Sequence, residues 1–441
     1  MKKIRLRRRR FLKGALGLGA LGAAGGLAPV ARLLAASPED RRTVLLFFNG
    51  GWDVLLGPDA RDRDYPGSLD MGYDLLPAEY RTTIPVTIGG TEVLWGAAMA
   101  PLVPHADVLT LFRGVNMNTV AHATGRAYVN TFIPPAGVVA RGDSLGTRLA
   151  TAVPTDDLIL PNVAMGVPSF NVSYGSEVTG VGVSRATEVR DLLRPLGSKL
   201  SEDVLSLLYA AQDASRSCVH ERVTTGSLDG KIRESRARVR RLFEEGLDVE
   251  FDLSDQPEVV ARYGIANPRN GREPGVVTAV TYKLLQTGLS RTVTAQVQFG
   301  MDTHTTNWAT TQPAKIEEGA RATAALLNDL REDDPNLDQT TVVLYSEFAR
   351  TPKINGNSGR DHWFASSILV FGGGLRRGVV GATTEETLGL VGIDVESGQP
   401  LEGGLVMRPE HIGATLAAAA GVDPSPFRVE PLRPWIMEGR S

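Results

Sequence analysis

The sequence predicts an α/β fold with a mostly parallel central sheet flanked by helices. Short apolar runs that end at glycine, proline or polar residues recur along the chain, as is typical of buried strands. The clearest runs are Thr43 to Phe48, Asp107 to Phe112, Thr292 to Phe299, Thr340 to Ser346 and Ser367 to Phe371. Between two of them, Ala314 to Arg331 has apolar residues at spacings of three and four, which indicates a helix with one apolar face. Strand, helix and strand in succession make a βαβ unit with parallel strands.

Residues 1–36 have the pattern of a removable export signal. Arg8-Arg9-Arg10-Phe11-Leu12-Lys13 closely matches the twin-arginine consensus, and a Gly/Ala/Leu run from Gly14 to Val30 leads to small residues before Ser37. A membrane anchor is the alternative, but the run holds many glycines and no Ile or Phe, so it would span a bilayer poorly. We therefore expect the twin-arginine translocation machinery to export the protein to the periplasm or the medium, with no stable membrane span after cleavage.

Charge and cysteine usage exclude further classes. Nine of the 47 Lys and Arg residues and none of the 50 Asp and Glu residues lie in the leader, which leaves 38 basic against 50 acidic residues. A nucleic-acid backbone is therefore not an expected partner. Cys218 is the only cysteine, so no internal disulfide can form. We expect residues 37–441 to form one large α/β domain that depends on packing for its stability.

Residues 195–263 interrupt the rhythm of strands. Two charged stretches with a helical pattern, Ser201 to Arg216 and Leu228 to Glu245, take the place of apolar runs. This segment is interpreted as a helical insertion or cap within the domain.

Acidic residues and histidines stand at the ends of several predicted strands, where sites form in a parallel sheet. The first strand leads through a glycine turn to a carboxylate, and two later strands lead to further carboxylates and a histidine, while an Asp-His pair precedes the last strand. Carboxylate oxygens and imidazole nitrogens suit divalent ions such as zinc or manganese. The predicted ligands of one or two such ions are Asp53, Asp302, His304, Glu347, Asp361 and His362.

Each of these residues has a structural alternative. Asp53 could cap a turn, His304 could be an ordinary loop histidine and Asp361 could cap a helix. Glu347 could instead pair with Arg350 three residues later.

The histidines outside this set are expected to be structural. His411 opens a predicted helix from Pro409 to Gly421. His105 and His220 have no neighbours of metal-ligand type in the sequence and are expected to be exposed to solvent.

The motifs FNGGWD, MDTH, SEFARTP, GRDHW and FGGGLRRG resemble those of the domain of unknown function 1501 family, which is placed in the alkaline phosphatase and sulfatase superfamily. The resemblance covers most of the chain after the leader and is weak across residues 195–263. It implies an alkaline phosphatase-like α/β sandwich and a two-metal hydrolase site for phosphate or sulfate esters. A small anionic ester is then the expected substrate.

The resemblance also implies roles for single residues. Asp53 resembles the superfamily's first metal carboxylate, and Asp302 with His304 resembles its aspartate and histidine pair, although only one residue separates them here. Asp361 and His362 resemble the Asp-His dyad. Alternatively, Glu347 takes the place of the dyad's carboxylate and His362 that of the later histidine.

The segment from His122 to Thr131 is similar in spacing to the sulfatase helix that carries the nucleophile. Arg126 and Thr131 match its arginine and threonine, Phe132 replaces its glycine, and His122 stands where the nucleophile belongs. An imidazole can bind a metal, act as a base or attack through nitrogen, but it cannot become formylglycine. His122 and Arg126 are therefore the candidate catalytic residues, with Thr119 as a reserve nucleophile. The alternative function is an exported binding or assembly protein that keeps the fold without turnover.

Overall fold

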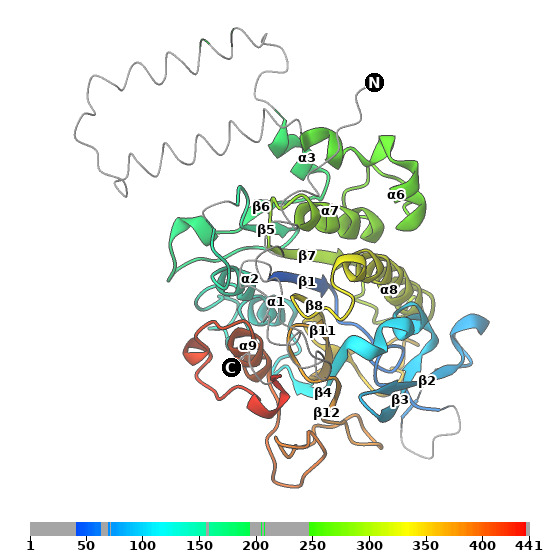
Figure 1. Cartoon of the computed structure of the whole chain (residues 1–441). Coiled ribbons are helices and arrows are strands. Elements are labelled where there is room, and N and C mark those ends of the chain that lie inside the picture. The colour runs from blue at the N-terminus through cyan, green and yellow to red at the C-terminus, as the bar shows by residue number, and fades with distance from the viewer. Residues whose placement is uncertain are drawn as a thin grey trace, which may run out of the picture. The chain divides into compact units, whose positions relative to one another are not determined.

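The computed structural model describes residues 41–62, 69–70, 72–155, 158–194, 204, 207 and 247–437. The chain divides into two units, Met1–Ser37 and Pro38–Ser441, and the described residues all belong to the second (Figure 1). The predicted signal peptide lies outside the described residues, as do His220 and nearly all of the two helical stretches predicted within 195–263. Within the described ranges, no helix has the length and apolar character needed to cross a membrane.

An eight-stranded sheet forms the centre of the fold, in the order β12-β4-β11-β8-β1-β7-β5-β6 (Figure 1). Its strands are β1 (Arg42–Phe48), β4 (Leu109–Asn116), β5 (Asn162–Met165), β6 (Val181–Val183), β7 (Thr292–Gln298), β8 (Thr340–Ser346), β11 (Ala365–Gly372) and β12 (Gly378–Val380). The five strands predicted from apolar runs are all confirmed. Strand β11 runs antiparallel to both of its neighbours, β4 and β8, while the other pairings in this sheet are parallel.

Helix α8 (Trp308–Asp333) joins β7 to β8 and confirms the predicted βαβ unit. In the sheet, β1 lies between these two strands, with Val44 paired to Val293 on one side and Val342 on the other. The first strand of the domain is therefore its centre, and the loops that follow β1, β7 and β8 leave the sheet side by side.

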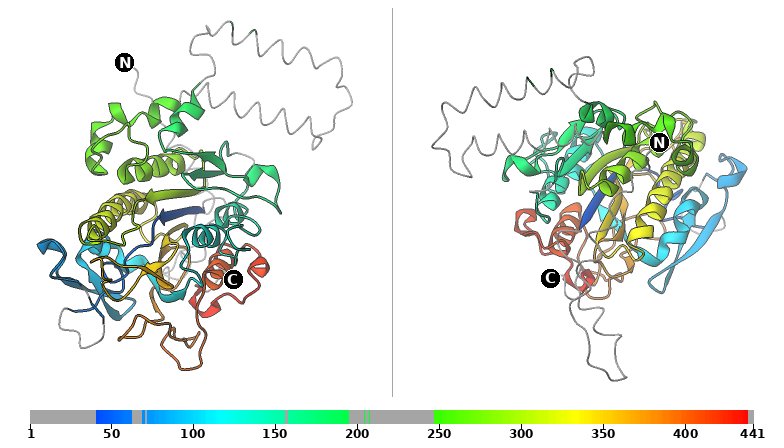
Figure 2. Two further views of the ribbon diagram at one scale, coloured as in Figure 1. Left: turned by 180° about the vertical axis from the view of Figure 1, so that it is seen from behind. Right: turned by 45° about the horizontal axis from the view of Figure 1, so that its top comes forward.

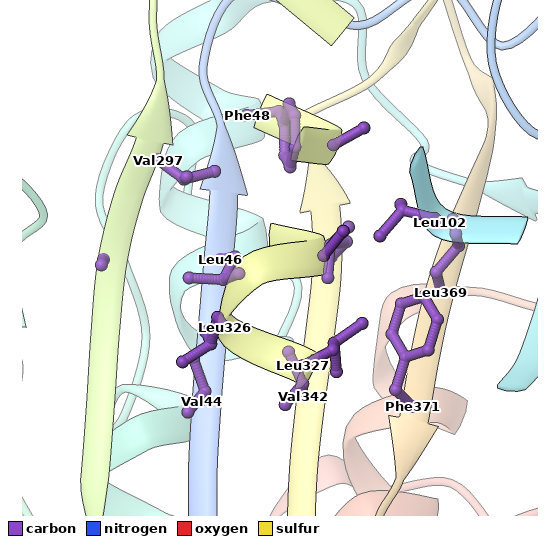
Figure 3. Close-up of a cluster of buried hydrophobic side chains, with 14 of the residues drawn as sticks. Val44, Leu46, Phe48, Leu102, Val297, Leu326, Leu327, Val342, Leu369 and Phe371 are labelled. Atoms are coloured by element: carbon purple, nitrogen blue, oxygen red, sulfur yellow. The ribbon is translucent and has the colours of Figure 1, made fainter. Parts of the chain in front are cut away.

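Helices cover both faces of the sheet (Figure 2). Successive residues of the central strands belong to different hydrophobic cores. Val44, Leu46 and Phe48 pack with the helices of one face, α7 (Pro274–Gln286), α8 and the 3₁₀ helix η4 (Ala97–Val108). Figure 3 shows part of this core, where Leu326 and Leu327 of α8 lie over β1 and β8.

The second core lies on the opposite face, because side chains of a strand alternate. Leu45 and Phe47 of β1 pack there with α2 (Leu145–Ala150) and α9 (Pro409–Ala419). Helix α1 (His122–Thr131) contributes Val129 to the same core. The sheet is thus buried on both sides, which explains why its strands appear in the sequence as continuous apolar runs.

The remaining elements are short. Two small antiparallel pairs accompany the main sheet, β2 (Thr83–Ile88) with β3 (Thr91–Gly96) and β9 (Ala349–Arg350) with β10 (His362–Trp363). The other helices are η3 (Ala78–Tyr80), η5 (Ser176–Val178), α3 (Glu188–Leu193), η6 (Leu247–Phe251), η7 (Leu253–Asp255), α6 (Pro257–Arg262), η8 (Ser425–Phe427) and η9 (Arg433–Trp435). Of the predicted insertion, the described end is helical, and the insertion as a whole stays a prediction.

Two expectations about histidines have different outcomes. The predicted helix that begins at Pro409 is confirmed as α9, and His411 in its first turn is buried. The expected exposure of His105 is wrong: its side chain is buried where η4 packs on α8, with Nδ1 3.4 Å from Nη1 of Arg331. The sequence around His105 could not reveal this contact, because Arg331 lies more than 200 residues away.

Candidate metal centre

One edge of the sheet gathers the polar segments singled out in the sequence. Strands β1, β7 and β8 are parallel, so their carboxyl ends share this edge. Because β11 is antiparallel, its amino end points to the same edge, and the preceding Asp361 and His362 join the loop that holds Asp302. Helix α1 follows β4 and brings His122 to the same place.

Three imidazoles converge on the carboxylate of Asp302. Its Oδ1 lies 2.9 Å from Nε2 of His304 and 3.1 Å from Nε2 of His362, and its Oδ2 lies 3.2 Å from Nε2 of His122. The Nε2 atoms of His304 and His362 are 3.0 Å apart. The ligand atoms of His122, Asp302 and His362 all lie within 4.8 Å of one another.

The other nitrogen of each ring faces an oxygen. The Nδ1 contacts are His122 with Oε1 of Glu347 at 2.9 Å, His304 with Oδ1 of Asp361 at 2.7 Å and His362 with the carbonyl of Val120 at 2.6 Å. A carbonyl oxygen only accepts, so Nδ1 of His362 carries a proton, and in the neutral ring the lone pair of Nε2 is directed at Asp302. The buried Nε2 of His122 makes no hydrogen bond to any described residue, although Asp302 is close to it. In proteins, a metal-binding histidine is usually oriented by an oxygen that contacts its other ring nitrogen, as the Nδ1 atoms are contacted here.

Glu347 is fully buried behind His122 and supports it. Its carboxylate accepts hydrogen bonds from the amide of Gly50 at 2.9 and 3.1 Å and from the hydroxyl of Ser346 at 3.1 Å. Helix α1 approaches Glu347 at Gly125, where a Cβ atom would lie 3.0 Å from Cβ of Glu347. The loop after β1, the end of β8 and α1 therefore meet around this one carboxylate.

Arg350 forms an ion pair with Asp302. The spacing in the sequence allowed a pair of Arg350 with Glu347, and the structure shows Asp302 as the partner instead. Nη2 of the fully buried arginine lies 2.9 Å from Oδ1 of Asp302 and donates to the carbonyl of Met301 at 2.9 Å. Its Nε donates to the carbonyl of Gly51 at 2.9 Å. Arg350 thereby joins the loops after β1 and β7 and orients Asp302.

Asp53 is fully buried and has other partners. Its carboxylate accepts hydrogen bonds from the amide of Leu55 at 3.0 Å and from Nε1 of Trp308 at 2.7 Å. Nε of Arg360, itself fully buried, lies 3.2 Å from Oδ2 of Asp53. The structure thus brings together five of the six predicted metal residues and places Asp53 in a separate ion pair.

The surroundings favour the metal-binding forms of Asp302 and His362, and the protonated form of His122. Burial acts to raise the pKa of Asp302, but the hydrogen bond from the guanidinium of Arg350 and its positive charge outweigh burial and hold that pKa well below its usual value. Burial lowers the pKa of His362, which favours the neutral ring. The hydrogen bond to Glu347 raises the pKa of His122. A metal ion that binds Nε2 of His122 would therefore compete with a proton for that nitrogen.

The other candidate catalytic residues flank His122. Arg126 is exposed, and its spacing of four residues on α1 places it on the same side of the helix as His122. The hydroxyl of Thr119 accepts a hydrogen bond from the amide of Ala121 at 3.2 Å, which holds it in the turn before α1.

Two participants were missed in the sequence. Arg350 was considered only as a partner of Glu347, although a lone arginine beside a buried strand end is a signal for a buried ion pair. Val120 contributes its backbone carbonyl to His362. No pattern of side chains could have indicated that contact.

The chain matches the model of one known protein family. Residues 41–395 match the model of a family described as a protein of unknown function, DUF1501. The chain belongs to the DUF1501 family. The match includes Asp302, the three converging histidines and Glu347. A comparison of this DUF1501 chain with curated proteins finds no match.

Several solved structures are similar to the DUF1501 chain at a low level. A Bacteroides thetaiotaomicron protein from a locus for the metabolism of multiple glycosaminoglycans has 9% identity and a TM-score of 0.36, covering 91% of this chain and 77% of its own. Ps i-CgsB, solved with a neocarrahexaose, has 8% identity and a TM-score of 0.33 (89% and 77%). The sulfatase PsFucS1 from Pseudoalteromonas sp. has 11% identity and a TM-score of 0.27 (93% and 74%). Likeness at this level carries no activity over to the chain.

Proposed function

We propose that this DUF1501 protein is an exported metal-dependent hydrolase of small phosphate or sulfate esters. The observation that supports the proposal is the arrangement of three histidines around one aspartate. Each ring directs Nε2 at Asp302 and holds an oxygen at Nδ1. Three imidazole lone pairs and a carboxylate repel one another unless protons or a cation lie between them.

The proposed ligands are His122, His304, His362 and Asp302. Three nitrogens and one oxygen form a donor set that suits zinc, and manganese is the second candidate. Glu347 and Asp361, which the sequence placed among the ligands, are proposed to orient His122 and His304 from behind. Asp53 is proposed to support the loop after β1 through its contact with Arg360. These four ligands suffice for one ion. The second ion that the sequence allowed stays a prediction.

A divalent ion in such a site polarises an ester oxygen and lowers the pKa of water. The residues of the chain do the rest. The side chain of Asp302 is 46% exposed, so solvent and substrate can reach the ligands from one side. Arg350 holds Asp302 from the buried side. Arg126 is proposed to attract the anionic group of the ester from its exposed position on α1.

A binding or assembly protein without turnover is the second candidate. It is favoured by the surroundings of His122, whose two ring nitrogens face carboxylates of Glu347 and Asp302. Such a ring is not free to attack a substrate. The reserve nucleophile Thr119 is likewise engaged, because its hydroxyl oxygen bonds the amide of Ala121.

Metal analysis followed by an ester screen tests both candidates. Residues 37–441 purified without added ions should contain about one zinc or manganese ion per chain. Asp302→Asn and His362→Ala should each lower metal content and thermal stability together, because an ion that binds only the folded state stabilises it. Asp394→Asn, which changes a partly exposed carboxylate outside the site, is the control: it disturbs hydrogen bonds from Ser397 and should leave the metal content unchanged.

The outcomes separate the proposals. Full metal content in both site variants would contradict the metal centre. Metal without hydrolysis of any phosphate monoester, phosphate diester or sulfate ester would favour the binding protein. Hydrolysis that disappears in Asp302→Asn and persists in Asp394→Asn supports the hydrolase.

A further inference from the structure

A cavity of about 580 Å³ lies beyond the carboxyl end of α1, away from His122. Its wall includes four arginines and one carboxylate, together with apolar side chains such as Phe427. The charged members are Arg141, Arg148, Arg408, Glu410 and Arg428. None of these residues contributes to the proposed metal centre.

The carboxylate in the wall is already engaged. Glu410 is buried; its Oε1 lies 2.9 Å from Nε of Arg408, and its Oε2 accepts a hydrogen bond from the hydroxyl of Tyr128. Arg141 and Arg428 are exposed at the cavity and form no ion pair with a carboxylate in the described part of the chain. The cavity therefore has an excess of positive charge.

Arg148 gives the cavity a buried polar group without a partner. Its side chain is 3% exposed and lies over the ring of Phe427, 5.5 Å from the ring centroid. Nη2 is 3.2 Å from Oδ2 of Asp143, and Nη1 donates to the hydroxyl of Tyr174 at 3.3 Å. Its Nε is buried and makes no hydrogen bond within the described residues. A buried donor left without an acceptor is unfavourable, and Arg148 lines the cavity, so we infer that this nitrogen would bond an acceptor atom of a ligand.

Backbone features add to the preference for an anion. Helix α9 begins at Pro409, beside Arg408 in the wall, and the amino end of a helix carries a partial positive charge. Arg428 has φ = 58°, a left-handed conformation that glycine or asparagine adopts more readily than arginine. An arginine at this backbone position is explained if its guanidinium has a function in the cavity.

We propose that this cavity binds a small organic anion, with its sulfonate, sulfate, phosphate or carboxylate group among the arginines and its apolar part against the partly exposed Ile133, Pro426 and Val429. Guanidinium groups recognise such oxyanions through pairs of parallel hydrogen bonds. The apolar wall selects for a ligand that carries a ring or alkyl group. The site is independent of the proposed hydrolase centre and does not require it.

Calorimetric titration with benzenesulfonate tests the proposal, because a sulfonate is a weak ligand for metal ions. Residues 37–441 should bind it, and the double variant Arg141→Gln/Arg428→Gln should bind about tenfold more weakly or worse. Arg269→Gln changes an exposed arginine outside the cavity and should bind like the unchanged protein. His362→Ala should also keep the affinity, which separates the cavity from the metal centre.

Methanesulfonate has the same anionic group without the ring and should bind more weakly than benzenesulfonate. Equal affinities for the two sulfonates would overturn the role of the apolar wall. No detectable binding, or binding that the double arginine variant leaves unchanged, would overturn the anion site. A loss of binding in His362→Ala alone would assign the sulfonate to the metal centre and equally overturn the proposal.

Discussion

Replacing Arg360 by methionine leaves the buried carboxylate of Asp53 without its cation. Both side chains are 0% exposed, and Nε lies 3.2 Å from Oδ2. Removing one partner of a buried ion pair costs about 3–5 kcal/mol. Arg360 also donates to the carbonyl of Thr351 at 2.6 Å, and that carbonyl loses its donor as well. The hydrogen bonds from Trp308 and Leu55 to Asp53 remain, so we expect a loss of about 3–5 kcal/mol in the free energy of unfolding rather than more.

Asp53→Asn changes the same pair from the other side and separates support from metal binding. An asparagine has nearly the same shape but no charge, so Arg360 becomes the unpaired member. We again expect a loss of about 3–5 kcal/mol, with metal content unchanged. In the double variant Asp53→Asn/Arg360→Met, the loss should be smaller than the sum of the single losses, because the two side chains are in contact.

Urea unfolding of chelator-treated protein measures these stabilities, and mass spectrometry of untreated protein measures the metal. Arg269→Met, at an exposed arginine, is the control for removing a positive charge. Metal loss in Asp53→Asn at unchanged stability would show that Asp53 is a metal ligand, and would contradict its proposed role as a support of the loop after β1. An Arg360→Met protein as stable as the control would refute the energetic reasoning about the pair.

Three further predictions concern other parts of the molecule. Gly125→Val should weaken metal binding without unfolding the protein, because a side chain at Gly125 pushes α1 away from Glu347. Ala123→Val, at an exposed position of α1, should leave metal binding unchanged. Equilibrium dialysis with zinc compares the two variants. Burial and the charge of Arg331 lower the pKa of His105 from 6.5 to about 4. As the pH drops from 6.5 to 4, the unfolded chain therefore binds this proton before the folded one does, and the free energy of unfolding should fall by up to about 3 kcal/mol. Urea unfolding at several pH values should show a weaker dependence of that free energy on pH in His105→Gln. Replacing Arg8 and Arg9 by lysine should leave the precursor in the cytoplasm, as cell fractionation would reveal, and normal export of this variant would contradict the twin-arginine signal.

The strands and the edge that carries the site could be predicted because the central strands are buried on both faces. Such strands are apolar at every position, and the residues that follow them must lie at one edge if the strands are parallel. This reasoning located Asp302, His304 and Glu347 directly. Asp361 and His362 were also chosen correctly as neighbours of a strand end. They reach the site because β11 is antiparallel to β8, and an apolar run does not reveal the direction of its strand.

The direction of individual side chains could not be predicted. Asp53 follows Gly50 and Gly51, whose φ values are 120° and 78°, and the turn they form directs its carboxylate to Trp308 of α8. Whether a carboxylate binds a metal or lies behind a histidine depends on distances of a few ångströms between segments far apart in the chain. Glu347 and His122, for example, are separated by 225 residues. The composition of the motifs was informative, but their division into ligands and supports required the structure.

The position of β1 has a consequence for biosynthesis. This strand leaves the ribosome soon after the leader, yet its partners β7 and β8 are completed only at Gln298 and Ser346. At about 5–20 residues per second, roughly 300 further residues take about 15–60 seconds to synthesise. During that interval both edges of β1 lack the strands that will cover them, and the central sheet cannot close. The predicted twin-arginine signal is compatible with this order of synthesis, because that route carries proteins that have already folded and export would follow completion of the last central strand.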